Sequence, residues 1–497
     1  MVETRENPVV VENRKPGTLS WLPQRLNFTP LTKHGQNLGP YAMNYLGSGR
    51  SPKIEGWCSH QTIKAGETLQ IFVNANPAGD FTLDLYRMGY YQRTGARQVM
   101  SAGPFSGTYR PDPIPGPMRL IECAWEPSFE FQIPDDWLSG VYLGKLTRVD
   151  DGTETYIIFV LRDEREAELI VQTSDFTWQA YNGWPNWYSL YSDGVDLVLY
   201  AWNEVAVSFD RPYASGHFTT MIPGAGEYFI FEFPFTYWLE SMGYDVTYCS
   251  NLDTHLGTAN TTRAKGFLSI GHDEYWTVEM HNNLRAAIDQ GLSIGFFSGN
   301  TSWAAIGLRP GASGQPDRVF SRIDRFGEKR ILETYPATHY VGAGHREHPV
   351  AGEAPDEGDL MGVRNDAPWS GGAHWACSLP DHWIFEGTGM VKGDSIPNLV
   401  GHEWMSLPSD DIEGLEVVST GTTYDKSVGL GEYAAVVYPG PKGNVVFTAS
   451  TCWWSTGLAF PPGFERPTWQ GMPAAMPDAR VQRITQNVLE KMISARA

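Results

Sequence analysis

Three groups of polar and aromatic side chains in this sequence follow directly after short apolar runs. The groups are TWQAYNGWPNWYSLYSDG after residues 169–171, GHDEYW after residues 267–270 and SGNTSW after residues 292–297. They contain two tyrosines, a His-x-Glu pair and an amide, at Tyr181, Tyr191, His272, Glu274 and Asn300. In open α/β sheets ligands bind beyond the carboxyl ends of the strands, so these side chains are predicted to converge on one site.

The His-x-Glu pair indicates the chemistry of that site. If residues 272–274 remain extended, His272 and Glu274 project to the same side, because side chains alternate along a strand. This arrangement suits a metal-binding carboxylate beside a general base. An exposed polar loop, or a helix N-terminus where acidic residues are favourable, remains the alternative.

Other motifs in the sequence are weaker candidates. GLSIG at residues 291–295 matches the nucleophile elbow, but it opens a predicted strand, so Ser293 is interpreted as a strand residue. His339, His345 and His348 lie close together without HExxH spacing, which favours a loop over a zinc site. The chain has no P-loop and no G-x-G-x-x-G after a strand, which argues against a nucleotide cofactor.

The elements around the three groups alternate between helix and buried strand. Residues 233–242 are predicted to be helical up to Gly243, and Thr277 is predicted to cap a helix that ends at Gly291. Near the C-terminus, two strands flank a PGPKG turn and a final amphipathic helix follows. This alternation predicts a largely parallel, Rossmann-like sheet covered on both faces over residues 166–497. Residues 310–430, rich in Gly, Pro, Asp and His, are interpreted as long insertions around the site.

The first third of the chain has a different pattern. Residues 1–44 are polar and rich in proline, and they are interpreted as an arm. Over residues 45–165 apolar residues alternate with polar ones between regular turn signals, which predicts an antiparallel β-sandwich. This sandwich carries no obvious chemistry.

Composition excludes several classes of function. The 497 residues carry a net charge of −20 and a pI near 5.0, so nucleic acid is not an expected partner. No apolar window is long enough for a transmembrane helix, and the N-terminus lacks an apolar signal core, so no membrane association is expected. The five cysteines show no CxxC spacing, which favours a reducing, cytoplasmic compartment.

The motifs AYN, SLYSDG, GHDEYW and SGN, in this order, resemble the large (β) subunit of N,N-dimethylformamidase. EGWCS, DLYRMGYY, DWLSGVYLGKL and YIIFVLRD resemble its sandwich. The resemblance extends well over residues 45–300 and loosely beyond. It implies an immunoglobulin-like β-sandwich followed by a Rossmann-like domain.

The resemblance also implies a mononuclear iron, expected to be ferric, with Tyr181, Tyr191 and Glu274 as its ligands. It implies catalytic roles for His272, Asn300 and Glu403. Phenolates and a carboxylate are hard oxygen ligands, which suits such an ion. Open coordination positions would admit water and a substrate carbonyl, His272 or Glu403 would transfer protons, and Asn300 would hydrogen-bond the oxyanion.

The sequence departs from the family in ways that affect the expected substrate. Tyr181 and Tyr191 are only ten positions apart, so a loop of the formamidase is missing. The additional N-terminal β domain of the formamidase is also expected to be absent. Both a homo-oligomer and a small accessory subunit are compatible with the sequence. The leading hypothesis is an iron-dependent hydrolase of a small carboxamide, N-alkylated or not, that yields an acid and an amine. The alternatives are a metal-dependent hydrolase of another C–N or ester bond, or a non-catalytic carbohydrate- or surface-binding protein.

Overall fold

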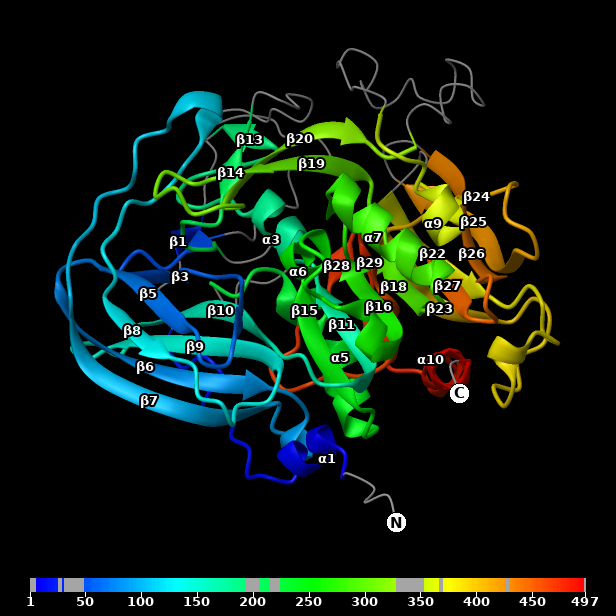
Figure 1. The fold of residues 1–497 in the computed structure, drawn as a ribbon, viewed down its shortest axis with the longest axis horizontal. Coiled ribbons are helices and arrows are strands. Elements are labelled where there is room, and N and C mark those ends of the chain that lie inside the picture. The colour runs from blue at the N-terminus through cyan, green and yellow to red at the C-terminus, as the bar shows by residue number, and fades with distance from the viewer. Residues whose placement is uncertain are drawn as a thin grey trace.

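The structure is a computed structural model that describes residues 6–25, 29–30, 49–193, 205–214, 224–327, 353–365, 370–425 and 429–495. A nine-stranded sheet forms its centre, and a β-sandwich packs beside it (Figure 1). The strands of the central sheet, in spatial order, are β15 (Val246–Ser250), β11 (Ala167–Thr173), β16 (Ala264–His272), β18 (Ser293–Gly299), β27 (Val445–Thr448), β26 (Gly429–Pro439), β25 (Glu416–Asp425), β22 (Ser370–Ala376) and β23 (Ser395–Glu403).

The central sheet is mixed. Neighbouring strands from β15 to β27 pair in parallel, whereas those from β27 to β23 pair antiparallel. The chain enters at β11, continues to β15 on one side, and then returns to β16 on the other side. This change of direction between β11 and β16 is the kind of position where open α/β sheets bind ligands.

Part of the sheet lies where the sequence predicted insertions. Strands β22, β23 and β25 fall within residues 310–430, and they extend the sheet beyond the predicted hairpin of β26 and β27. These strands contain glycines and are only partly apolar, so their sequences lack the apolar runs or the regular alternation that predict strands. A sheet edge can recruit such a segment through backbone hydrogen bonds alone. His339, His345 and His348 lie outside the described residues.

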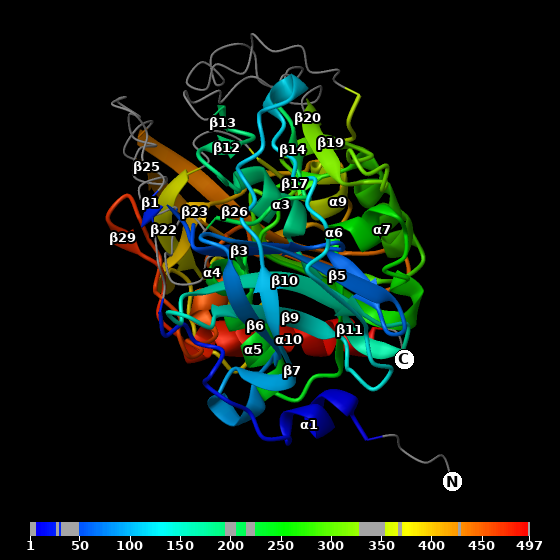
Figure 2. The same cartoon turned by 90° about the vertical axis from the view of Figure 1, so that its left-hand side faces the viewer.

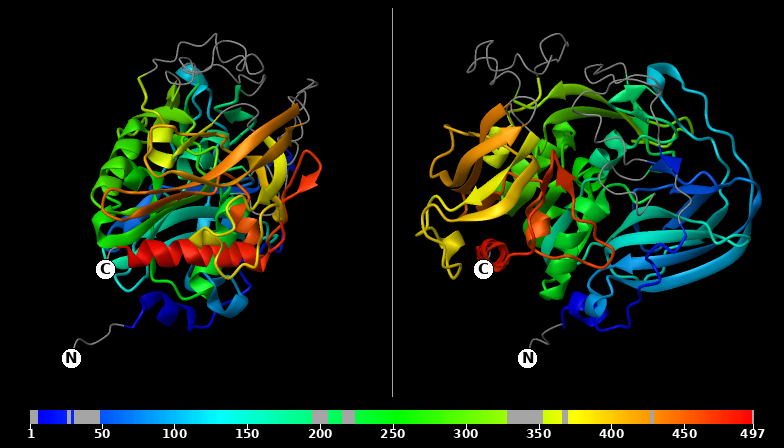
Figure 3. Two further views of the ribbon diagram at one scale, coloured as in Figure 1. Left: turned by 90° about the vertical axis from the view of Figure 1, so that its right-hand side faces the viewer. Right: turned by 180° about the vertical axis from the view of Figure 1, so that it is seen from behind.

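Helices cover both faces of the parallel half of the sheet (Figures 2 and 3). Leu169 and Val171 of β11 belong to the same buried cluster as α5 (Phe233–Ser241) and α10 (Ala479–Ser494). Ile170, which points to the opposite face, belongs to the cluster that contains α7 (Val278–Asp289). The apolar runs of the sequence are continuous because these strands are buried on both faces.

The predicted helix ends are confirmed. The Thr277 side chain accepts a hydrogen bond from the backbone N–H of Met280 (3.2 Å), which caps α7. Gly243 and Gly291 follow α5 and α7 with φ of 79° and 100°, a conformation that glycine adopts without steric cost.

The sandwich consists of one five-stranded and one three-stranded sheet. Its strands are β4 (Thr62–Lys64), β10 (Glu154–Arg162), β9 (Gly140–Arg148), β6 (Gly79–Met88) and β7 (Ala96–Gly107) in the larger sheet, with β3 (Ile54–Cys58), β5 (Thr68–Ala75) and β8 (Phe129–Gln132) in the smaller. The prediction of an antiparallel sandwich is wrong at one edge, where β4 pairs parallel to β10. The chain crosses from β3 in the smaller sheet to β4 in the larger one, so β4 can join the edge in either direction.

The outer face of the larger sandwich sheet is buried against the rest of the protein. Ile157 and Phe159 of β10 belong to the core of the sandwich, whereas Tyr156 and Ile158 belong to the cluster that contains α5 and α10. The N-terminal segment adds α1 (Pro8–Asn13) to this junction. Residues 1–5, 26–28 and 31–44 of the predicted arm lie outside the described residues. In the described part of the chain, no helix is both long enough and apolar enough to cross a membrane.

Candidate metal and acid–base site

Two tyrosines meet at the carboxyl end of β11. Tyr181 is the last residue of α3 (Asp175–Tyr181), the short helix that follows β11. Tyr191 lies between β12 (Tyr188–Ser189) and β13 (Ser192–Asp193), whose hairpin turns the chain back toward α3. The two rings stack with centroids 4.9 Å apart, and their hydroxyl oxygens are 3.2 Å apart.

Glu274 completes a group of three oxygen-bearing side chains. It lies between β16 and β17 (Tyr275–Trp276), where its backbone N–H donates to Thr177 Oγ1 (2.9 Å). Tyr181 donates to Glu274 Oε2 (2.6 Å), and Tyr191 donates to Glu274 Oε1 (3.1 Å). The sequence therefore identified three residues that the tertiary structure does bring into contact.

The oxygens of this group have the spacing of ligands around one ion. Oxygen ligands about 2.1 Å from a metal stand about 3 Å apart when they bind at right angles. The three contacts among Tyr181, Tyr191 and Glu274 measure 2.6, 3.1 and 3.2 Å. Because two phenols and a carboxylate are hard oxygen ligands, the residues present fit an iron ion of the ferric type.

The surroundings of Tyr181 and Tyr191 determine whether their hydroxyl groups are ionised. Burial and the Glu274 carboxylate raise the pKa of Tyr181 and Tyr191 well above the ordinary range, so both are neutral phenols in the metal-free chain. Arg322, whose guanidinium carbon lies 5.0 Å from the Tyr191 ring centroid, acts in the opposite direction on the pKa of Tyr191. A bound cation reverses this preference, because it stabilises the phenolates.

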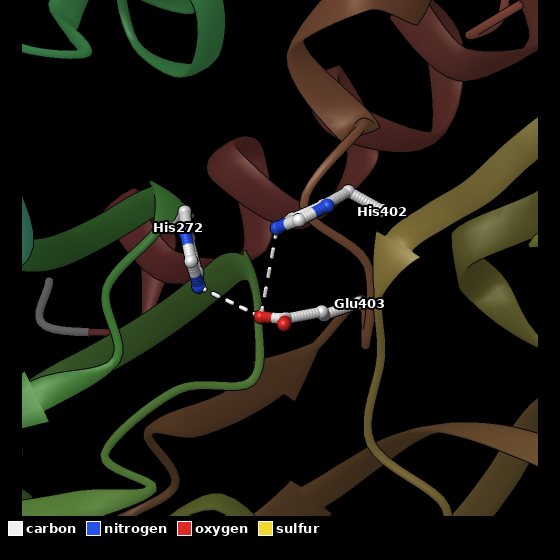
Figure 4. A group of neighbouring side chains, drawn as sticks. All are labelled: His272, His402 and Glu403. Atoms are coloured by element: carbon white, nitrogen blue, oxygen red, sulfur yellow. Dashed lines mark ion pairs between the residues drawn. The ribbon is translucent and has the colours of Figure 1, made fainter. Parts of the chain in front are cut away.

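A second group of polar side chains adjoins the first. His272 at the end of β16 places Nε2 2.8 Å from Glu403 Oε2 and 3.3 Å from Glu274 Oε2. Asn300, which follows β18, donates from Nδ2 to Glu403 Oε2 (2.8 Å). Figure 4 shows Glu403 between His272 and His402, and His402 Nε2 is 3.8 Å from Glu403 Oε2. All these residues are almost fully buried.

The charges around His272 favour its protonated form. Burial lowers its pKa, but the neighbouring Cys452, Glu403, Glu227 and Glu274 side chains prevail and hold the pKa well above the usual range. Burial raises the pKa of Glu403, and the His272 imidazolium opposes that shift. A proton shared between these two groups is therefore held beside the oxygen-ligand group.

Two glycines of the motifs have a steric reason to be present. A Cβ at Gly271, where φ is 75°, would lie 2.5 Å from the Phe231 Cβ. A Cβ at Gly299 would lie 2.5 Å from both the backbone nitrogen of Cys452 and the carbonyl oxygen of Glu403. These close approaches let β16 and β18 deliver His272 and Asn300 to the same place.

Several residues at this site were not identified from the sequence. His402, Glu227, Tyr275 and Arg322 each contact a member of the two groups. His402 is adjacent to Glu403 in VGHEW, and Tyr275 follows Glu274 in GHDEYW. These two residues could therefore have been predicted from their positions beside known members of the site. Glu227 and Arg322 lie in segments whose sequences carry no such motif, so only the tertiary structure shows their proximity.

Similarity to known proteins assigns the chain to a family. No curated protein matches the sequence. Solved chains that match include Escherichia coli alpha-2-macroglobulin activated by porcine elastase, which is 12% identical with a TM-score of 0.15. That match covers 23% of this chain and 9% of the macroglobulin chain, and a likeness of this extent carries no argument. The family model described as "N,N-dimethylformamidase beta subunit-like, C-terminal" matches residues 82–469, and this protein therefore belongs to that family.

Proposed function

We propose that this protein is an iron-dependent amide hydrolase that cleaves a small carboxamide to a carboxylic acid and an amine. One observation carries the proposal: the oxygens of Tyr181, Tyr191 and Glu274 lie 2.6–3.2 Å apart at a buried strand end. Membership of the N,N-dimethylformamidase β-subunit-like family supports the reaction type. When bound to these oxygens, iron supplies Lewis acidity toward a carbonyl and a water molecule.

The chain's own residues supply the proton transfers of this reaction. The Glu403 carboxylate takes the proton of the attacking water, and the His272 imidazolium, 2.8 Å away, donates a proton to the nitrogen of the departing amine. The proton then passes from Glu403 to His272, which restores both groups. Asn300 has a second N–H besides the one donated to Glu403, and this N–H donates to the developing oxyanion. Overall, one water and one amide are converted to one acid and one amine.

Purified protein tests the proposal through metal content and turnover together. We expect one iron per chain, a visible phenolate-to-iron absorption band, and release of dimethylamine or ammonia from N,N-dimethylformamide or formamide. Tyr181→Phe and Tyr191→Phe should lose the band and the iron, because each removes one oxygen ligand. The exposed Tyr109→Phe variant is the matched control and should retain both.

The result also separates this proposal from its alternatives. Wild-type protein without stoichiometric iron would contradict the metal site. Iron-loaded protein that hydrolyses esters but not amides would retain the site and overturn the substrate class. His402→Ala distinguishes the oxygen group from the neighbouring His272, His402 and Glu403 group as the place of binding, because only the latter would lose metal.

The finer features of the architecture belong to the same proposal. The order of the parallel strands supports a Rossmann-like unit over residues 166–497, and the two-sheet sandwich supports an immunoglobulin-like unit over residues 45–165. The family description refers to a β subunit, which supports a small accessory subunit as a partner. Five free, buried cysteines support a cytoplasmic location.

A further inference from the structure

The loop that joins Tyr181 to Tyr191, residues 182–190, surrounds the side chain of Arg211, which comes later in the sequence. Arg211 is 1% exposed and follows β14 (Val207–Ser208), a strand outside the central sheet. Its guanidinium group donates to five neutral oxygens. These are Gln179 Oε1 (3.0 Å) and the backbone carbonyls of Asn182 (3.0 Å), Trp184 (2.8 Å), Tyr188 (2.6 Å) and Ser208 (3.2 Å).

We propose that Arg211 is the positioning residue of the metal site, because it holds Tyr191 beside Tyr181 and thereby sets the affinity for the metal. This inference rests on the proposed function in one respect only, the identity of the three metal ligands. The five acceptors of Arg211 do not include the proposed ligand oxygens, so its effect passes through α3 and the backbone of residues 182–190.

The contacts of Arg211 connect both tyrosine-bearing segments. Gln179 belongs to α3 and lies two residues before Tyr181, whereas Asn182, Trp184 and Tyr188 lie between the tyrosines. Asn182 strengthens the connection, since its Nδ2 donates to Gln179 Oε1 (2.8 Å) and to the carbonyl oxygen of Pro212 (2.9 Å). One guanidinium group therefore fixes the end of α3 and the start and end of the loop together.

Arginine is suited to this task in a way that lysine is not. Its planar fork offers five N–H donors in a fixed geometry, whereas an ammonium group offers three donors from one point. Burial lowers the pKa of Arg211 to about 9, so the group is still charged at neutral pH. A lysine there would leave buried carbonyls of the loop without a donor, and the loop would rearrange to satisfy them.

The test compares Arg211→Lys and Arg211→Met with wild type in two states. In the metal-free protein, backbone amide hydrogen exchange should rise in residues 182–191 and stay unchanged in the sandwich strands. In the iron-loaded protein, competition with a chelator should show that the affinity for iron falls by about 10- to 100-fold. This is the usual effect of replacing a residue that supports metal ligands without binding the metal itself. The phenolate-to-iron band of the iron-loaded protein should shift in wavelength, which a general loss of stability would not cause.

Arg148→Lys is the matched control. Arg148 is also 1% exposed and donates to two backbone carbonyls, those of Lys53 (3.0 Å) and Pro77 (2.7 Å), but it lies in the sandwich. This variant should keep wild-type iron affinity and band position. If the Arg211 variants do not fold, Gln179→Met removes one acceptor and should give a smaller loss of iron affinity in the same direction.

The outcomes separate this inference from the proposed function. Unchanged exchange in residues 182–191, or unchanged iron affinity in an Arg211 variant, overturns the positioning role. Wild-type protein that binds no iron overturns the proposed function instead. In that case the exchange measurement on metal-free protein still decides whether Arg211 holds the loop.

Discussion

At the scale of single residues, this site contains two adjacent groups of side chains with different proposed roles, metal binding and proton transfer. Tyr181, Tyr191 and Glu274 bring two hydroxyl and two carboxylate oxygens together, and His272 with Glu403 holds a proton next to them. The groups are joined by the 3.3 Å contact between His272 Nε2 and Glu274 Oε2. Replacement of His272 therefore distinguishes proton transfer from metal binding.

In the His272→Ala variant we expect iron and its absorption band to remain while kcat falls by roughly 10²–10⁴, the usual contribution of general acid–base catalysis. The reason is that His272 supplies no metal ligand under the proposed function. Iron content and turnover are measured on the same preparation. Loss of iron in parallel with activity would instead assign His272 a role in orienting Glu274, and full activity with full iron would eliminate both roles.

Asp175, at the first position of α3, provides a prediction about pH. Its Oδ1 accepts from the backbone N–H of Asn251 (2.7 Å), and its buried Oδ2 has no hydrogen-bond partner among the described residues. Burial raises the pKa of Asp175 from 3.8 to about 8. Between these values the folded protein holds a proton that the unfolded chain has lost, so the free energy of unfolding decreases as the pH rises.

Asp175→Asn should remove this decrease, because asparagine keeps the Oδ1 acceptor and does not titrate. We expect the variant to gain stability relative to wild type between pH 5 and pH 9, measured by urea unfolding at both values. The exposed Asp135→Asn variant is the control and should follow the wild-type profile. Parallel profiles for Asp175→Asn and wild type would show that Asp175 is ionised in the folded protein.

At the scale of elements, the site depends on close approach of strand ends. Strand β18 ends at Gly299, where the backbones of Glu403 and Cys452 leave no room for a side chain. The loop after α3 is held from the other side by the sandwich, since the Trp184 indole N–H donates to Glu55 Oε1 (2.9 Å). The end of β18 therefore limits the position of Glu403, and the sandwich limits the position of the loop that carries Trp184.

Gly299→Ala should disturb the site without removing any functional group. The new methyl would lie 2.5 Å from the Glu403 carbonyl oxygen, so one backbone must move. We expect about 1–3 kcal/mol lower free energy of unfolding, as overpacking typically costs, and reduced kcat at normal iron content. Gly116→Ala, where the nearest atom to the new methyl is 3.6 Å away, is the control for thermal melting and turnover. Wild-type behaviour of Gly299→Ala would show that the two strand ends are free to separate.

At the scale of the whole molecule, the sandwich and the central sheet share one core. Arg87 of β6 forms a fully buried pair with Glu240 of α5, through contacts of 2.8 and 3.1 Å. Glu240 also accepts from Tyr248 of β15 (2.8 Å) and from Asn13 of α1 (2.8 Å). This carboxylate therefore joins the N-terminal segment, the sandwich and the sheet.

Glu240→Gln should destabilise the whole protein. It leaves the Arg87 charge buried without its partner, which typically costs about 3–5 kcal/mol in the free energy of unfolding. Denaturant unfolding measures the loss, and the remaining folded protein should bind iron normally because neither Arg87 nor Glu240 is one of the proposed metal ligands. Glu6→Gln removes an exposed pair with Arg14, whose side chains are 60% and 67% exposed, and should cost about 0–1 kcal/mol. Equal effects of the two variants would contradict a shared core.

The sequence by itself determined the elements and the identity of the polar groups at the strand ends. Alternation predicted β5, β6 and β8, apolar runs predicted β11, β16 and β18, and capping residues predicted the ends of α5 and α7. These features are local, since each depends on the spacing of neighbouring residues along one strand or helix. Five residues of the candidate site, Tyr181, Tyr191, His272, Glu274 and Asn300, were identified from their position after apolar runs. Glu403 came only from the resemblance, which also assigned the roles of all six.

Only the tertiary structure decided which of these elements are neighbours and what supports the site. It brought Glu227, His402 and Arg322 to the site, paired β22, β23 and β25 into the central sheet, and placed Arg211 inside the tyrosine loop. These contacts join residues far apart in the sequence through backbone carbonyls and buried charges. Since every residue has a backbone carbonyl that can accept a hydrogen bond, the sequence of the loop does not predict that Arg211 donates to its carbonyls.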